Sequence, residues 1–159
     1  MEPEQVNVIY HSPCFDGFCA CLGAFLCHSN VHFYPYHPGS ELTLLPALIT
    51  YFLDTVTTES IFQSATSLSH QVVVIDHHWD VPALITSWNS SAKVQIIHNT
   101  EQSACILAWN HFKSKRSPLT TSEESDTEIE KILLYVQDRD LYRNALPGGE
   151  EVIAGLGEM

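Results

Sequence analysis

A run of four aliphatic residues, VVVI at 72–75, constrains the fold of this chain more than any other segment. A strand that is apolar at every position has to be buried on both faces, which is typical of a parallel strand inside an α/β sheet. The run ends abruptly in Asp76, His77 and His78. Three polar side chains beside a buried strand cost free energy unless they have partners. Because α/β proteins build their sites at the carboxyl ends of strands, the junction predicts a functional site.

The remainder of the chain alternates between strand and helix patterns. Apolar runs predict five strands, over 6–10, 31–36, 49–53, 72–75 and 94–97. Helical spacing predicts helices over 16–27, 42–48 (a short one because of Pro46), 58–69, 102–112 and, as the final element, 127–138. Segment 113–126 is polar and is predicted to be a solvated loop. This alternation predicts an α/β fold, a doubly wound and mainly parallel sheet flanked by helices, in one domain over 1–159.

Charge and composition exclude several functions. The 159 residues include 19 acidic and only 7 basic side chains, for a net charge of −12. So acidic a surface does not bind long nucleic acid nonspecifically, although bound divalent cations would change the local field. No segment approaches the roughly 20 apolar residues of a membrane span, and no signal peptide is present. We therefore expect a cytoplasmic protein with no membrane partner.

The five cysteines are expected to be reduced packing residues, because their number is odd and their spacing matches no common zinc motif. They are Cys14, Cys19, Cys21, Cys27 and Cys105.

Carboxylates and imidazoles follow several of the predicted elements and should converge at one edge of the sheet. They are His11, Asp16, Asp54, Asp76, His77, His78, Asp138 and Asp140. Such donors suit Mn²⁺, Mg²⁺ or Zn²⁺ better than a thiolate site does. Asp16 and Asp54 could instead cap helices. The remaining histidines have no such position and are expected at the surface or in packing: His28, His32, His37, His70, His98 and His111.

The sequence resembles the DHH phosphoesterase superfamily, which includes RecJ-type exonucleases, oligoribonucleases and family II inorganic pyrophosphatases. Five ordered blocks spanning nearly the whole chain carry the resemblance: IYHSPCFDGFCAC, YFLDT, VVVIDHH, QSACILAWNHF and VQDRDLYR. It implies two Mn²⁺ or Mg²⁺ ions and a catalytic motif at Asp76, His77 and His78. The implied metal ligands are His11, Asp16, Asp54 (bridging), Asp76, His77, and Asp138 or Asp140.

The resemblance implies a metal-dependent phosphoesterase that hydrolyses a small phosphorylated substrate, a nucleotide or short oligonucleotide, through metal-activated water. The chain departs from the family pattern in three places, and two of the departures, at residue 18 and at the C-terminal domain, favour an alternative, a catalytically weak or inactive domain that binds metal or nucleotide for regulation. Phe18 stands where many members carry a second Asp, and the spacing from His11 to Asp16 is one residue longer than in the commonest version. The usual C-terminal substrate-binding domain is also expected to be missing.

Overall fold

Five parallel strands form one sheet in the order β2-β1-β3-β4-β5. The computed structural model describes residues 5–88, 92–116 and 122–157. The strands are β1 (Val6–His11), β2 (Val31–Tyr36), β3 (Ala47–Leu53), β4 (Ser69–Asp76) and β5 (Val94–His98). All five lie where the apolar runs predict strands, and the α/β fold class is confirmed.

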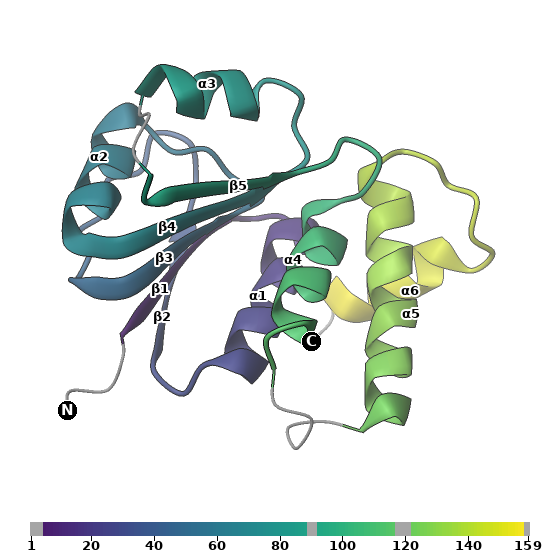
Figure 1. Ribbon diagram of the computed structural model, residues 1–159. Helices are drawn as coiled ribbons and strands as arrows, with labels where there is room; N and C mark the ends of the chain where they lie inside the picture. Colours follow the sequence, from purple (N-terminus) through teal and green to yellow (C-terminus); the bar gives the residue numbers. More distant parts are fainter. Residues whose placement is uncertain (1–4, 89–91, 117–121, 158–159) are drawn as a thin grey trace.

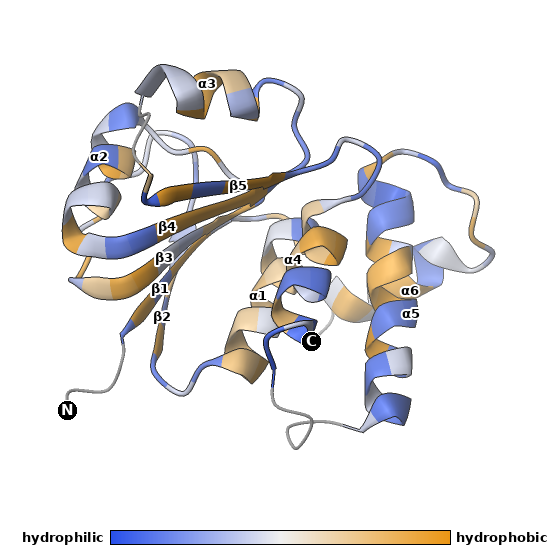
Figure 2. Ribbon diagram, in the orientation of Figure 1, coloured by the Kyte–Doolittle hydropathy of each residue, from blue (hydrophilic) through white to orange (hydrophobic). Residues whose placement is uncertain are grey.

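Helices cover both faces of the sheet, as Figure 1 shows. They are α1 (Phe15–Cys27), α2 (Glu59–Leu68), α3 (Val81–Trp88), α4 (Ala104–Lys113), α5 (Glu123–Asp140) and α6 (Gly149–Gly157). One face packs against α1, α4, α5 and α6, and the other against α2 and α3. Figure 2 shows hydrophobic residues concentrated in the strands between these layers.

The central strand β4 explains the two-sided core. Residues 72–75 are all fully buried, and they alternate between the two faces. Val73 and Ile75 pack with the α1 and α4 layer, whereas Val72 and Val74 pack with the α2 and α3 layer. An uninterrupted aliphatic run is thus needed because neither face of this strand meets water.

The strand order creates a switch point between β1 and β3. The chain leaves β1 through α1 toward β2 on one side, and it continues from β3 through β4 to β5 on the other. The connections diverge at this point, beside the carboxyl ends of β1 and β3. Open α/β sheets commonly bind their ligands at such a switch point.

Three sequence predictions about elements were wrong. Residues 42–46 form no helix, and Ala47 already begins β3. Helix α3 was not predicted, and α6 follows the helix predicted to be last.

The end of the predicted polar loop 113–126 forms the first turn of α5, while 117–121 lie outside the described residues. Its acidic residues favour the positive end of the helix dipole, and the Ser122 hydroxyl accepts a hydrogen bond from Ser125 N. Among the described residues, no helix is long and apolar enough to cross a membrane.

Candidate functional site

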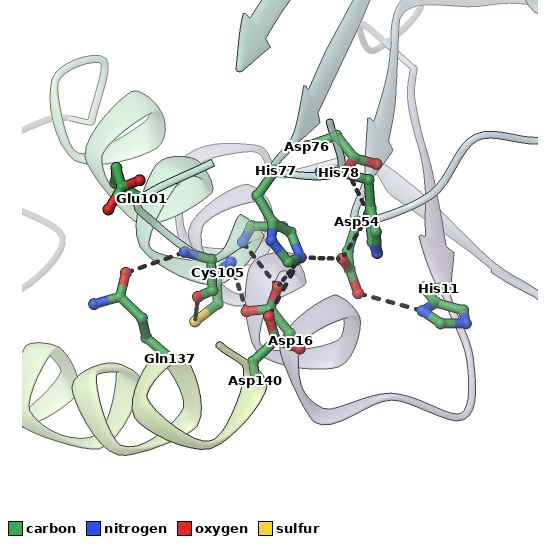
Figure 3. A network of polar contacts seen from close by, with 12 residues as sticks. His11, Asp16, Asp54, Asp76, His77, His78, Glu101, Cys105, Gln137 and Asp140 are labelled. Atoms are coloured by element: carbon green, nitrogen blue, oxygen red, sulfur yellow. Dashed lines mark hydrogen bonds and ion pairs between the residues drawn. The ribbon is translucent and has the colours of Figure 1, made fainter. Parts of the chain in front are cut away.

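Residues from four separate parts of the chain meet at the carboxyl edge of the sheet (Figure 3). His11 is the last residue of β1, Asp54 follows β3, and Asp76 ends β4 just before His77. Asp140 reaches them from the last turn of α5. The edge predicted from the strand ends is therefore where these side chains gather.

Asp54 lies at the centre of the cluster, between two imidazoles. Its Oδ2 is 3.4 Å from His11 Nδ1, and its Oδ1 is 3.4 Å from His77 Nε2. The residue is only 2% exposed and has a left-handed backbone, with φ of 56°. Asp tolerates this conformation better than most residues, yet it remains uncommon, and such backbones concentrate at functional sites. The two carboxylate oxygens of Asp54 thus face different imidazoles.

His77 connects Asp54 to two further carboxylates. Its Nε2 lies 3.3 Å from Asp140 Oδ2 and 3.9 Å from Asp16 Oδ2. Three carboxylates and two imidazoles therefore form one continuous cluster, running from His11 to Asp140 (Figure 3).

Asp16 is fixed by the start of helix α4. Its two oxygens accept hydrogen bonds from Ala104 N (2.8 Å) and Cys105 N (2.9 Å). The capping interpretation of Asp16 is therefore half correct. Asp16 lies in the first turn of its own helix α1, but the orphan N–H groups that it satisfies belong to α4.

Asp76 positions the turn that carries His78. Its Oδ1 accepts hydrogen bonds from His78 N (2.8 Å) and pairs with His78 Nδ1 (2.8 Å). This carboxylate raises the pKa of His78 to about 9. On the other side, His98 Nε2 lies 2.8 Å from the His78 carbonyl oxygen. Asp76 itself is fully buried.

The two candidate acids of the last block have different surroundings. Asp138 accepts hydrogen bonds from Ala145 N (3.0 Å) and Leu146 N (3.1 Å), which hold the loop between α5 and α6. Asp140 instead faces His77. The structure therefore places Asp140, and not Asp138, in the carboxylate cluster.

The cluster perturbs the protonation of its members. Burial, followed by the charge of Asp16, raises the pKa of Asp140 to about 6. Burial and the charge of Asp54 likewise raise the pKa of Asp16. Burial opposes ionisation of Asp54 as well, but the imidazoles of His11 and His77, each 3.4 Å from one of its oxygens, outweigh it and lower the Asp54 pKa to about 2.

The same contacts act on the two imidazoles. Hydrogen bonding to Asp54 raises the pKa of His11. Burial disfavours charged His77, yet Asp54 and Asp140 raise its pKa overall. Negative charge is thus concentrated where a cation could offset it.

Several buried atoms of the cluster lack a hydrogen-bond partner within the described residues: Asp54 Oδ1, Asp76 Oδ2, His77 Nε2 and Asp140 Oδ2. Unsatisfied polar atoms are costly unless a ligand supplies the contact. Three overlapping groups could each hold a metal ion. They are His11 with Cys14 and Asp54, Asp54 with His77 and His78, and Asp16 with His77 and Asp140. The donor set therefore fits divalent cations.

Sequence reasoning missed two residues at this site. Cys14 was expected to pack in the core, but it belongs to the first metal-compatible group. His98 was not predicted to lie at a strand end. The structure shows that β5 extends to His98, which pairs in register with Asp76. Two features of the sequence indicate these residues. Cys14 lies between the predicted ligands His11 and Asp16, and His98 directly follows an apolar strand.

Comparison with known proteins shows similarity in fold. No family model and no curated protein matches the chain. An uncharacterized protein from Helicobacter pylori G27 matches with a TM-score of 0.69 and 14% identity, covering 89% of this chain and 45% of that one. An exopolyphosphatase-related protein from Bacteroides fragilis matches with a TM-score of 0.55 and 16% identity, covering 98% and 52%. The chain thus spans about half the length of these two structures.

Proposed function

We propose that this protein is a divalent-metal-dependent phosphoesterase of the DHH type, acting on a small phosphorylated substrate. The observation that carries the proposal is the position of Asp54. This buried carboxylate turns one oxygen toward His11 and the other toward His77, and the second oxygen has no hydrogen-bond partner among the described residues. A carboxylate that bridges two ions requires this arrangement.

In the proposed centre, His11 and Asp54 would hold one ion, and Asp16, His77 and Asp140 would hold the second. Two Mn²⁺ or Mg²⁺ ions bound there would supply an activated water nucleophile and offset charge on the phosphoryl oxygens.

Asp76 acts through His78 in this proposal. It accepts one hydrogen bond from the His78 backbone N–H and one from the imidazole Nδ1, and it keeps the imidazole protonated, since the His78 pKa is about 9. Half-exposed and cationic, His78 is placed to contact a phosphoryl oxygen. Asp138 has the separate task of holding the loop that follows Asp140.

A small anionic substrate is favoured by the distribution of positive charge. Arg139 lines a 260 Å³ recess together with Asp16 and Asp140. Its guanidinium makes no hydrogen bond or ion pair within the described chain, so it is available for a phosphate. Exposed Tyr142 lines the same recess and offers a ring for a nucleobase.

With so few cations in an acidic chain, we propose a nucleotide or short oligonucleotide rather than a long polymer. One structural neighbour is an exopolyphosphatase-related protein, which supports chemistry at phosphorus.

A second candidate is metal or nucleotide binding without efficient turnover. Phe18 favours it, because this side chain stands where a second early carboxylate would be and is 65% exposed. Fewer carboxylates would hold the ion near His11 less tightly. Such a protein would bind metal and nucleotide but hydrolyse neither phosphodiesters nor phosphomonoesters.

Hydrolysis in the presence of Mn²⁺ tests the proposal. Purified protein should hydrolyse a generic phosphodiester or a short oligonucleotide, and His77→Gln should abolish the activity. Asp80→Asn is the matched control, because Asp80 is exposed in the same turn and belongs to none of the metal-compatible groups. Hydrolysis that persists in His77→Gln, or none in the wild type, would contradict the phosphoesterase proposal.

A further inference from the structure

Cys14 occupies the turn between β1 and α1, at the switch point of the sheet. It is the N-cap residue of α1, with an extended backbone (φ −151°, ψ 133°), but its side chain makes no capping hydrogen bond. Ser, Thr, Asp and Asn are the residues that usually cap helices through their side chains. The thiol at this position is therefore not explained by helix capping.

The thiol lies within a compact set of donors. One donor atom each from His11, Cys14 and Asp54 lies within 4.8 Å of the other two. Ordinary zinc–ligand distances in a tetrahedron place donors about 3.4–3.6 Å apart. The His11 Nδ1 to Asp54 Oδ2 distance is already 3.4 Å. Cys14 supplies the third donor of this group.

The neighbouring sequence explains why a thiol is needed here. Phe18 cannot supply a ligand, and its ring lines an apolar groove with Tyr10 and Leu156. A second observation concerns the carboxylate that this group shares with the His77 group. Asp54 is 98% buried, its Oδ2 faces His11, and its Oδ1, which faces His77, lacks a hydrogen-bond partner among the described residues.

We infer that Cys14 coordinates the ion held by His11 and Asp54, and that this position prefers a borderline cation such as Zn²⁺ or Co²⁺ over Mg²⁺. The inference rests on the proposed metal centre and adds a ligand and a selectivity to it. Thiolate is a soft ligand that Mg²⁺ does not favour, whereas Zn²⁺ and Co²⁺ accept it together with imidazole. The thiol proton passes to solvent as the metal–sulfur bond forms.

Cobalt spectroscopy tests the coordination directly. Titration of the metal-free protein with Co²⁺ alone should produce a sulfur-to-cobalt charge-transfer band in the near ultraviolet. Cys14→Ser should remove the band and weaken Zn²⁺ binding by about tenfold or more. Cys19→Ser is the matched control, because Cys19 lies on the same helix outside the metal-compatible groups, and it should keep the band.

Two results would separate failure of this inference from failure of the proposed function. If Co²⁺ binds with no charge-transfer band, or with a band that survives in Cys14→Ser, then Cys14 is not a ligand while the metal centre stands. If no divalent cation binds at all, the metal centre itself is refuted, and this inference with it.

A variant with a harder ligand gives an independent readout. Cys14→Asp restores a carboxylate near the position where Phe18 replaces one. It should lose the cobalt band, retain metal binding, and shift the preference toward Mg²⁺ and Mn²⁺ by about tenfold relative to Zn²⁺. An unchanged Zn²⁺-to-Mg²⁺ preference in a folded Cys14→Asp protein would overturn the selectivity assigned to the thiol.

Discussion

Replacing Asp140 with Asn should stabilise the metal-free protein and at the same time remove most of the stabilisation that metal provides. Asp140 Oδ2 is buried without a hydrogen-bond partner in the described structure, and its neighbours include the carboxylate of Asp16. Ionising Asp140 in the fold is therefore unfavourable until a cation is present. Asparagine keeps the shape of the side chain and removes the charge.

The magnitude follows from the pKa. Burial and neighbouring charge raise the Asp140 pKa from 3.8 to about 6. The shift corresponds to about 3 kcal/mol at 1.36 kcal/mol per pKa unit. Because the side chain is 21% exposed, solvent screening reduces the expected gain to about 1–3 kcal/mol.

The direction with pH follows from the same shift. The folded protein binds the Asp140 proton more tightly than the unfolded chain does. The penalty is therefore complete above pH 6 and disappears as the pH falls from about 6 toward 3.8.

Urea unfolding of metal-free protein at about pH 8 measures the effect. Asp140→Asn should raise the free energy of unfolding, and Mn²⁺ should then stabilise the wild type much more than the variant. Asp138→Asn is the control two residues away. It should destabilise the protein, because the Asp138 carboxylate accepts backbone hydrogen bonds. The reasoning is refuted if Asp140→Asn destabilises the metal-free protein, or if Mn²⁺ stabilises both proteins equally.

Three further substitutions test how the site is built. Gly17→Ala should lower the free energy of unfolding by about 1–3 kcal/mol, because the new Cβ would lie 2.4 Å from the His11 carbonyl oxygen. Gly155→Ala is the control, since open space surrounds that position. Equal thermal midpoints for the two variants would contradict the predicted clash. Asp16→Ala should lower the free energy of unfolding in urea by about 2–5 kcal/mol, because two buried N–H groups of α4 lose their acceptor. An unchanged urea midpoint would contradict the role of Asp16 in anchoring α4. Burial lowers the His111 pKa from 6.5 to about 4, so wild-type stability should fall by up to about 3 kcal/mol as the pH drops through that window. His111→Gln should show a flatter pH profile, and an unchanged slope would exclude this histidine as the cause.

The strands could be predicted because burial on both faces leaves a direct signal in the sequence. Residues 72–75 are apolar at every position, and so short an apolar run favours a buried strand over a helix. The edge at which Asp54 and Asp76 gather follows from the same reasoning, since parallel strands bring their carboxyl ends together.

The choice between Asp138 and Asp140 depended on tertiary structure. Both acids lie in the last turn of α5, so spacing alone cannot distinguish them. The difference arises from the loop after α5, whose backbone N–H groups bind Asp138.

Helix α6 was not predicted because its stability also depends on tertiary contacts. Its nine residues include three glycines, which disfavour a helix in isolation. Buried Ile153 packs against the α1 and α5 layer and supplies the tertiary contact that stabilises it.

The proposed role of Asp54 as a bridging carboxylate can be tested most directly by counting bound metal. Calorimetric titration of the metal-free protein with Mn²⁺ should reveal two ions per chain, and Asp54→Asn should weaken both sites because each uses one of its oxygens. Binding of no ion, or two-site binding that is unaffected by Asp54→Asn, would contradict the proposed centre.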